Sequence, residues 1–512
     1  NKVKLGLAHT YLLHGVTGSG KTEVYLQVAK KVLKNNQQVL IMVPEISLTP
    51  QMIDRVSKRF GRDVAIYHSA LNEQEKYEQY NRVKNNQVKI VVGTRSSIFL
   101  PFKNLGLIVL DEEHDSSYKQ QNIPYYHARD IAAWRQEYHQ CPVILGSASP
   151  SLESYARALK SVYTLINLPD RINYSFPKVT LVDTQKTLYN QEGYYITDTL
   201  EKAIRLRLDR KEQVVLLLNR RGYLPILRDA KTQQVLECPN CDVALNYHKF
   251  DKVLRCHICS YQTNRNPENV KIIGQGMGTE RLTEFVESKF PDARVLRMDA
   301  DTTRTKGSHQ RILDSFINHE YDILIGTQMI AKGLDIENVT LVGVVNADAG
   351  LAHTDYRSVE QSFATLLQAA GRSGRGSKEG EVIMQSFNPD HYAIVCAVNQ
   401  KYKHFFKQEM EYRKLASYPP YSYLISIVFY DEDLLKAQRA ADEFDELMQE
   451  FPIQKIGPTI IRRLSNRHRV RIILKGKDLD YMIQKCNEVV EHYRKINRTR
   501  FTVDVNPMSL ES

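Results

Sequence analysis

Short apolar runs that end in small or charged residues recur along the chain. They cover residues 11–13, 38–43, 88–92, 105–110 and 142–145, and later 213–218, 293–298, 321–325 and 341–345. Their intervals suit strands that alternate with helices in an α/β fold. We therefore expect parallel sheets, in which the polar residues after each run share one edge, where ligands bind.

The last hundred residues have a different pattern. Strand-like and helix-like segments follow one another at 422–430, 433–450, 453–461, 469–476, 479–495 and 500–507. The order strand, helix, strand, strand, helix, strand predicts a small α+β domain of ferredoxin-like order. Residues 468–475 alternate between apolar and cationic side chains, which predicts an edge-like strand with its cations on one face.

Composition limits the class of protein. The chain has 512 residues, too many for one core, and 42% of them are hydrophobic and 25% charged. It contains no run of about 18 apolar residues, so we expect no membrane span. The first residues lack a signal-peptide layout and an initiator Met, so we expect a chain that begins inside a longer, cytoplasmic protein.

Positive charge is concentrated at one end of the chain. The formal net charge is +11, and residues 451–512 hold 13 Lys and Arg against 6 Asp and Glu. Such an excess favours a polyanionic partner, although a merely solvated surface is the alternative.

Residues 15–22, GVTGSGKT, form a complete phosphate-binding loop between an apolar run and a segment of helical spacing. Glycines allow backbone N–H groups to surround phosphate oxygens, the lysine binds the outer phosphates, and the threonine hydroxyl binds Mg²⁺. The motif predicts an ATP and Mg²⁺ site. Its nucleotide-binding residues are Gly15, Thr17, Gly18, Ser19, Gly20, Lys21, Thr22 and Glu23.

The apolar run 105–110 is followed by four acids within five residues. Like charges this close repel each other, and a bound cation would offset the repulsion. We expect Asp111 to hold Mg²⁺ together with Thr22, and Glu112 to act as general base on the attacking water. His114 would link this site to the next strand end.

A glycine-rich segment at 368–376 carries Gln368, Arg372 and Arg375. ATP hydrolysis needs a cation on the transferred phosphoryl group, and an arginine from a second lobe supplies one in many motors. We therefore assign catalytic roles to these three residues, together with Lys21, Asp111 and Glu112.

Two CxxC pairs, Cys238/Cys241 and Cys256/Cys259, are separated by fourteen residues. Four thiolates in this arrangement predict one tetrahedral Zn²⁺ that folds a small insert.

Aromatic and basic residues alternate after the acids, as is typical of contacts with unpaired bases. We expect DNA contacts from Arg95, Tyr125, Tyr126 and Arg129, and from a second cluster near the C-terminus: Arg462, Arg463, Arg467, Arg469 and Arg471. For Trp134, stacking on bases and packing inside the lobe are equally open.

The ordered motifs GVTGSGKT, DEEH, GSAS, GTQMIAKG and QAAGRSGR resemble a superfamily-two helicase motor with two RecA-like lobes. Further stretches, among them VPEISLTPQM, DEEHDSSYKQ, PYYHARD, NRRGY and NADAGL, resemble the PriA family of bacterial replication-restart helicases over nearly the whole chain. The family's N-terminal DNA-binding region and winged-helix domain have no counterpart in this sequence.

The resemblance implies an ATP-dependent 3′-to-5′ DNA helicase that recognises stalled or branched forks and promotes primosome assembly. Its implied partners are single-stranded and forked DNA, other primosome proteins and single-stranded DNA-binding protein, and we expect a monomer in the cytoplasm, at the nucleoid. The expected domains are a first lobe at 1–175, a second lobe at 176–225 and 272–400, a zinc insert at 226–271 and a C-terminal domain at 416–512.

The sequence departs from the family pattern at several positions. An outer set of four cysteines is missing, so one zinc ion is expected where the family has two. Tyr125 stands where arginine is common, and Ser149 and Leu334 also differ from the usual residues. Two alternatives stay open: an RNA helicase, and a fork-binding scaffold with a weak motor.

Overall fold

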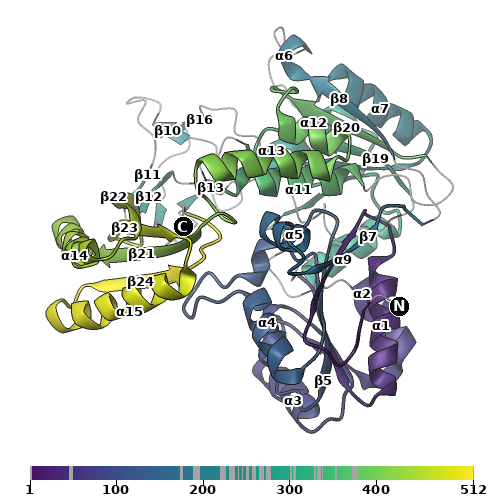
Figure 1. The fold of residues 1–512 in the computed structure, drawn as a ribbon. Helices are drawn as coiled ribbons and strands as arrows, with labels where there is room; N and C mark the ends of the chain where they lie inside the picture. Colours follow the sequence, from purple (N-terminus) through teal and green to yellow (C-terminus); the bar gives the residue numbers. More distant parts are fainter. Residues whose placement is uncertain are drawn as a thin grey trace. The chain divides into compact units, whose positions relative to one another are not determined.

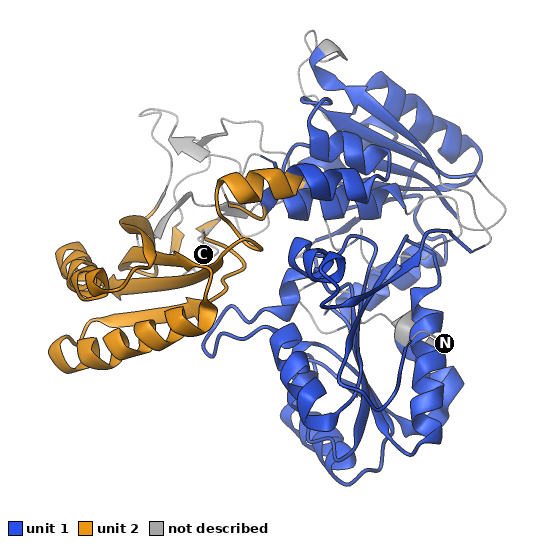
Figure 2. Cartoon of the chain, in the orientation of Figure 1, with its two compact units in different colours: residues 1–221, 279–352, 358–408 blue, residues 222–278, 353–357, 409–512 orange. Residues whose placement is uncertain are grey.

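The computed structural model divides into two compact units, described separately (Figure 2). Unit 1 comprises residues 1–221, 279–352 and 358–408, and unit 2 comprises residues 222–278, 353–357 and 409–512. The structure describes residues 3–44, 50–172, 177–187, 196–218, 227–229, 237–239, 241–244, 246–248, 253–255, 261–263, 270–272, 278–299, 302–303, 307–327, 330, 336, 338–351, 355–371 and 379–510. Among these residues, no helix has the length and apolar character needed to cross a membrane.

The first part of unit 1 is a seven-stranded parallel sheet with the order β3-β4-β2-β5-β6-β1-β7 (Figure 1). Its elements are β1 (Thr10–Gly15), α1 (Lys21–Lys34), β2 (Gln38–Met42), α2 (Pro50–Phe60), β3 (Val64–Tyr67), α3 (Glu73–Lys84), β4 (Ile90–Gly93), β5 (Leu105–Asp111), α4 (Ala128–His139), β6 (Val143–Ser147), α5 (Leu152–Leu159) and β7 (Thr164–Leu168). The five strands expected in this part of the chain are confirmed.

Alternating side chains of these strands form the core of the first sheet. Leu13 of β1, Ile41 of β2 and Val109 of β5 pack with Leu26 and Val32 of α1, and all are fully buried. This packing places the C-terminal ends of β1, β5 and β6 side by side, because β1 and β5 both pair with β6. The phosphate-binding loop, the acids and the GSAS segment therefore meet at one sheet edge, as the sequence predicts.

The second part of unit 1 is a six-stranded parallel sheet with the order β17-β18-β9-β19-β20-β8. Its elements are β8 (Lys178–Asp183), α6 (Thr184–Thr187), α7 (Asp198–Asp209), β9 (Gln213–Leu217), α8 (Thr279–Lys289), β17 (Val295–Met298), α9 (Ser308–Ile317), β18 (Ile323–Gly326), β19 (Val339–Val344), α11 (Ser358–Ala370), β20 (Glu381–Ser386), α12 (Tyr392–Val398) and α13 (Tyr402–Leu415). Two parallel α/β sheets are thus confirmed, with β9, β17, β18 and β19 at the expected places.

Unit 2 contains short antiparallel strands from the cysteine-bearing segment: β10 (Leu227–Asp229), β11 (Glu237–Cys238), β12 (Cys241–Ala244), β13 (Asn246–His248), β14 (Val253–Arg255), β15 (Gln262–Thr263) and β16 (Val270–Ile272). Its C-terminal part is an antiparallel sheet of order β22-β23-β21-β24. The elements are β21 (Tyr423–Asp431), α14 (Leu434–Leu447), β22 (Gln454–Leu464), β23 (Arg467–Gly476), α15 (Leu479–Ile496) and β24 (Arg500–Val505), in the predicted order.

One expectation for this sheet is wrong. β23 was expected to be edge-like, but it lies between β22 and β21, and β22 is the edge. Val470, Ile472 and Leu474 of β23 pack under α14 and α15, which explains the alternation of its side chains. Alternation reports that one face of a strand is buried and does not report how many strands flank it.

Candidate functional site

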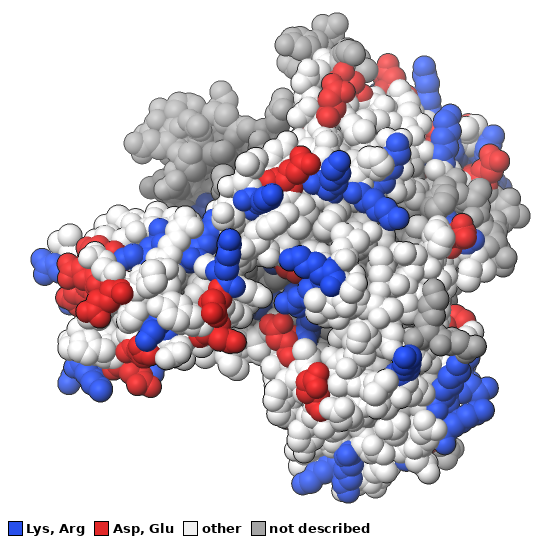
Figure 3. All heavy atoms as spheres, viewed as in Figure 1, with Lys and Arg blue, Asp and Glu red and all other residues white. Residues whose placement is uncertain are grey.

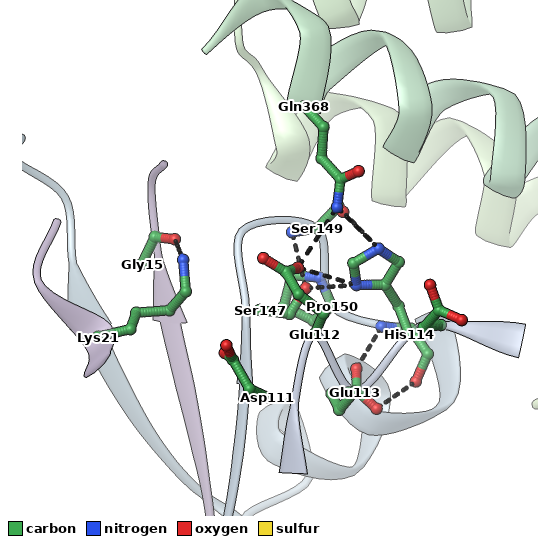
Figure 4. A network of polar contacts seen from close by, with 12 residues as sticks. Gly15, Lys21, Asp111, Glu112, Glu113, His114, Ser147, Ser149, Pro150 and Gln368 are labelled. Carbon is green, nitrogen blue, oxygen red and sulfur yellow. Dashed lines mark hydrogen bonds and ion pairs between the residues drawn. The ribbon is translucent and has the colours of Figure 1, made fainter. Parts of the chain in front are cut away.

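The turn between β1 and α1 has the backbone of a phosphate-binding loop. Gly18 and Gly20 adopt left-handed conformations with φ of 81° and 83°, which glycine accommodates without strain. Lys21 Nζ donates to the carbonyl oxygen of Gly15 at 2.8 Å, so the lysine folds back over the loop (Figure 4). Thr22 is half-buried in the first turn of α1, and the exposed Glu23 pairs with Arg59.

The segment after β7 covers this loop, which the sequence did not predict. Ile172 N donates to Gly18 O at 3.1 Å, and a Cβ at Gly20 would approach Ile172 Cδ1 to 2.5 Å. Arg171 lies against Gly18 and donates to the carbonyl oxygen of Gly371 at 3.2 Å. A Cβ at Gly371 would in turn meet Thr17 at 2.8 Å, so the residue that ends the QAAG segment contacts the loop.

Asp111 lies at the end of β5, facing the first helix. The Tyr25 hydroxyl donates to Asp111 Oδ1 at 2.9 Å, and the Tyr118 hydroxyl donates to the Asp111 carbonyl at 2.6 Å. Burial raises the pKa of Asp111 to about 6, and the charge of Glu112 adds to the rise, while Lys21 and the Tyr25 hydrogen bond oppose it. Sequence reasoning missed Tyr25, whose one signal is its position one helical turn after Lys21.

Glu112 is the meeting point of the two sheets. Gln368 Nε2, on α11 of the second sheet, lies 3.4 Å from Glu112 Oε2 and 3.4 Å from His114 Nε2 (Figure 4). His114 Nδ1 lies 2.7 Å from Ser147 Oγ, which confirms the expected link from His114 to the next strand end. Glu112 itself has a left-handed backbone, with φ of 46°.

Glu113 points away from the nucleotide loop and is 1% exposed. Its carboxylate accepts from Ser151 N at 2.6 Å and Ser154 Oγ at 2.9 Å at the start of α5, and lies 3.4 Å from Arg129 NH1. Arg129 also donates to the hydroxyls of Ser151 and Ser154, each at 3.0 Å. Arg129 and the two serines therefore stabilise the charge of Glu113, one of the four acids. Arg129 belongs to a hydrogen-bond network with these three side chains.

The loop between β5 and α4 positions the other expected contacts of the first sheet. Arg95 NH1 donates to the carbonyl oxygens of Ser117 at 3.0 Å and Lys119 at 2.9 Å, and its guanidinium carbon lies 5.9 Å from the Tyr126 ring. Tyr125 and Tyr126 are half-buried. Trp134, for which packing and exposure were equally open, is 64% exposed on α4.

The C-terminal arginines lie on β22, which carries Arg462 and Arg463, and on β23, which carries Arg467, Arg469 and Arg471. Along β23, Arg467, Arg469 and Arg471 alternate with core residues and so lie on the face opposite α14 and α15. Arg469 Nε donates to Arg462 O at 2.7 Å, and Arg463 NH2 donates to Pro239 O, beside Cys238, at 2.8 Å. Acidic side chains gather over the α14 end of this domain in Figure 3.

Some expected residues cannot be placed. Cys238 is buried and lies opposite Cys241 in the β11–β12 pair. Cys256, Cys259, Arg372 and Arg375 lie outside the described residues. Within the part of the chain that the structure describes, no group of three or more His, Cys, Asp or Glu side chains could hold a metal ion.

Two parallel sheets with a phosphate-binding loop on one and a glutamine from the other define a P-loop protein of the helicase class. Accordingly, residues 4–158 match the DEAD/DEAH box helicase family and residues 248–377 the helicase conserved C-terminal domain. Residues 414–508 match the primosomal protein N C-terminal domain.

The chain is also similar to individual curated proteins. It is 42% identical to the replication restart protein PriA of Bacillus subtilis, over 97% of this chain and 64% of that protein. It is 40% identical to PriA of Synechocystis, over 98% and 63%, and 36% identical to PriA of Chlamydia pneumoniae, over 99% and 70%. The chain therefore belongs to the PriA family of replication restart proteins, and it spans slightly less than two thirds of the first two relatives.

Proposed function

We propose that the chain is the motor part of an ATP-dependent 3′-to-5′ DNA helicase that acts at stalled or branched replication forks and promotes primosome assembly. The observation that carries this proposal is the contact of Gln368 with Glu112 and His114, because it joins residues of two sheets at one nucleotide site. A motor needs such a junction to convert hydrolysis into relative movement of its lobes. Membership of the PriA family supports DNA as the track.

The roles of the nucleotide site follow from its geometry. The backbone from Gly15 to Gly20 would surround the phosphates of ATP, and Lys21 would leave Gly15 O to bind the outer phosphates. The side chains of Thr17, Ser19 and Thr22 would add hydroxyl groups to the nucleotide site, and Glu23 lies in the first turn of α1. Glu112 would orient and deprotonate the attacking water, with Gln368 and His114 holding its carboxylate.

The donor set fits Mg²⁺. Asp111 is a half-buried carboxylate whose pKa is raised by desolvation and then by the charge of Glu112, and a divalent cation would offset both. Asp111 and the Thr22 hydroxyl would hold the ion, which when bound neutralises charge on the phosphates. Arg372 and Arg375 would supply the remaining positive charge from the second lobe, worth roughly 10³ to 10⁵ in rate.

For the cysteine segment we propose one Zn²⁺ held by Cys238, Cys241, Cys256 and Cys259. The pairing of Cys238 with Cys241 across β11 and β12 brings the first two ligands to one hairpin, which fits a zinc knuckle. One zinc ion per chain, measured by atomic emission spectrometry, is the expected result, and none would contradict the assignment.

We propose DNA contacts in two places. Tyr125 and Tyr126, held beside Arg95, would stack on unpaired bases after the metal-binding acids. Arg467, Arg469 and Arg471 would bind phosphates on the helix-free side of the C-terminal sheet, and Arg462 would bind them from the neighbouring strand β22. Arg129 and Arg463 remain within the proposal, but their side chains contact other protein groups, so we expect them to support these surfaces.

The remaining features of the proposal follow the family. The working domains would be 1–175, 176–225 with 272–400, 226–271 and 416–512. A monomer in the cytoplasm, at the nucleoid, would bind single-stranded and forked DNA, other primosome proteins and single-stranded DNA-binding protein.

ATP hydrolysis with and without forked DNA, at fixed salt, tests the proposal. We expect strong stimulation by DNA, weaker stimulation by RNA of equal length, and loss of stimulated hydrolysis in Lys21→Ala with fork binding kept. Equal stimulation by RNA would favour an RNA motor. A folded chain that binds forks but never hydrolyses ATP would contradict the motor and favour a scaffold.

A further inference from the structure

A second concentration of buried charge lies in unit 2, away from the nucleotide residues in sequence. Arg357, Glu409, Arg413 and Lys475 are each 7% exposed or less. Charged side chains are costly to bury unless other groups satisfy them, and such clusters often hold a particular arrangement of the chain. We call this set, with Tyr356 and Tyr418, the Tyr356 cluster.

The cluster is built on two stacked tyrosine rings. The ring centroids of Tyr356 and Tyr418 lie 5.1 Å apart, and the angle between the ring planes is 13°. The guanidinium carbons of Arg413 and Arg357 lie 4.9 and 5.1 Å from the Tyr356 ring, and Lys475 Nζ lies 4.1 Å from the Tyr418 ring. Desolvated cations are attracted to the faces of aromatic rings, which offsets part of the cost of burial.

Hydrogen bonds fix the arginine at the centre of the cluster. Arg413 Nε donates to Glu409 Oε1 at 2.9 Å, and Arg413 NH1 donates to Pro419 O at 2.9 Å. Lys475 Nζ donates to Ala416 O. The C-terminal half of α13, the turn that follows it and the end of β23 are therefore joined at one point.

The C-terminal tail is tied to the same point. The Tyr356 hydroxyl donates to Pro507 O at 2.8 Å. Asp355 Oδ2 accepts from Ser509 Oγ at 2.8 Å and from Leu510 N at 2.6 Å. Residues 355–357 are thus held by three segments that follow them in the sequence by 57 to 155 residues.

The residue after this triplet begins α11. Ser358 is the first residue of the helix, and Gln368, ten residues on, is the residue that contacts Glu112 and His114. At 1.5 Å per residue, about 15 Å of continuous helix separates the two. Most of α11 is buried, so a shift of its first turn would displace Gln368 rather than be absorbed by the helix.

We propose that Tyr356 and Arg413 are positioning residues for ATP hydrolysis, because they fix residues 355–357, which lead directly into α11, the helix that carries Gln368. The proposal rests on the proposed function. It has a consequence for DNA coupling, since Arg469, Arg471 and Lys475 share one face of β23. The two arginines and Lys475 lie on the same strand, β23. A phosphate bound by the arginines would therefore pull on the strand whose Lys475 contacts the Tyr418 ring of the Tyr356 cluster.

The test compares Tyr356→Ala, Tyr356→Phe and Lys485→Met. Lys485 makes the same kind of contact, 5.1 Å from the Phe451 ring, on α15 of the same domain, so its variant is a matched control. For each chain, kcat and KM for ATP are measured with and without forked DNA, together with the Kd for the fork and the melting temperature. We expect about a tenfold lower DNA-stimulated kcat in Tyr356→Ala, with KM and Kd near those of the unmodified chain. The melting temperature should fall, because the variant uncovers two buried guanidinium groups, and it serves to show that the chain is folded at the assay temperature.

Two further results separate positioning from a merely structural role. Tyr356→Phe keeps the ring and should keep at least half of the stimulated kcat, and Lys485→Met should keep all of it. Gln368→Ala lowers kcat by itself, and adding Tyr356→Ala to it should lower kcat no further, because both act through one residue. Full additivity of the two losses would overturn the proposal.

Other outcomes are equally decisive. A folded Tyr356→Ala chain with unchanged kcat would overturn the proposal. If that variant does not fold, Asp355→Asn, which weakens only the link to the tail, takes its place with the same expectation. An unmodified chain that DNA does not stimulate would contradict the proposed function instead, and the basal kcat of the same variants would still test the positioning role.

Discussion

The acid run after β5 and the Tyr356 cluster are both concentrations of buried charge, but they are satisfied differently. In the Tyr356 cluster, tyrosine faces, carbonyl oxygens and Glu409 cover the cations from within unit 2. At the acid run, Asp111 keeps a raised pKa beside Glu112 despite Lys21 and Tyr25. The difference teaches that charge left unbalanced by the protein marks the place where a ligand of opposite charge belongs.

The same contrast holds between adjacent residues of the acid run. Glu113 is enclosed by Arg129, Ser151 and Ser154. The neighbouring Glu112 instead faces His114, which follows the same strand, and Gln368, which comes from the second sheet. One carboxylate stabilises the start of α5, and the other is available for chemistry.

The Glu112→Gln variant tests the carboxylate that faces the second sheet, and it should have the largest effect of the changes predicted here. Removing the carboxylate that we propose as general base should lower kcat for ATP by roughly 10² to 10⁴ while leaving the melting temperature unchanged. Single-turnover hydrolysis measures the chemical step, thermal unfolding measures the melting temperature, and binding of a fluorescent ATP analogue measures nucleotide affinity. A variant that loses nucleotide binding together with hydrolysis would show that Glu112 holds substrate and is not a base.

The Glu113→Gln variant tests the carboxylate that is enclosed by protein groups. Loss of one partner of a buried ion pair should lower the free energy of unfolding by about 3 kcal/mol, while kcat per folded molecule stays near that of the unmodified chain. Denaturant titration checks the first value. Glu23→Gln, which removes an exposed partner of Arg59, is the control and should cost less than about 1 kcal/mol.

The raised pKa of Asp111 predicts a smaller effect, on the pH dependence of Mg²⁺ binding. Because burial raises it to about 6 from 3.8, the ionised form is disfavoured in the folded chain, and this group's contribution to stability falls as pH rises from about 4 to 6. Mg²⁺ requires the ionised form, so its affinity in the presence of ADP should fall as pH drops below 6, about tenfold per unit. Calorimetric titration at several pH values measures this, and Asp111→Asn should remove the difference.

Local patterns account for what could be predicted. The phosphate-binding loop, the strand before the acids and the six elements of the C-terminal domain depend on residue types and periodicities within about 20 residues. In the two parallel sheets, β3, β7, β8 and β20 were not predicted, and three of them, β3, β7 and β20, lie next to strands that were. Strands of four to six residues carry too little periodicity to be separated from loops without their neighbours.

The sequence by itself determined two parallel α/β sheets, a nucleotide loop and an acid-ended strand, because backbone conformation and strand periodicity are encoded locally. Only the tertiary structure decided which acid meets Tyr25, that Glu113 and Arg129 pair inside the first sheet, and that Gln368 reaches Glu112 from 256 residues away. It also decided that β23 is an inner strand and that residues 355–357 meet the C-terminal tail. Side-chain partners depend on sheet order and packing between distant segments, and neither leaves a periodic signal in the residues concerned.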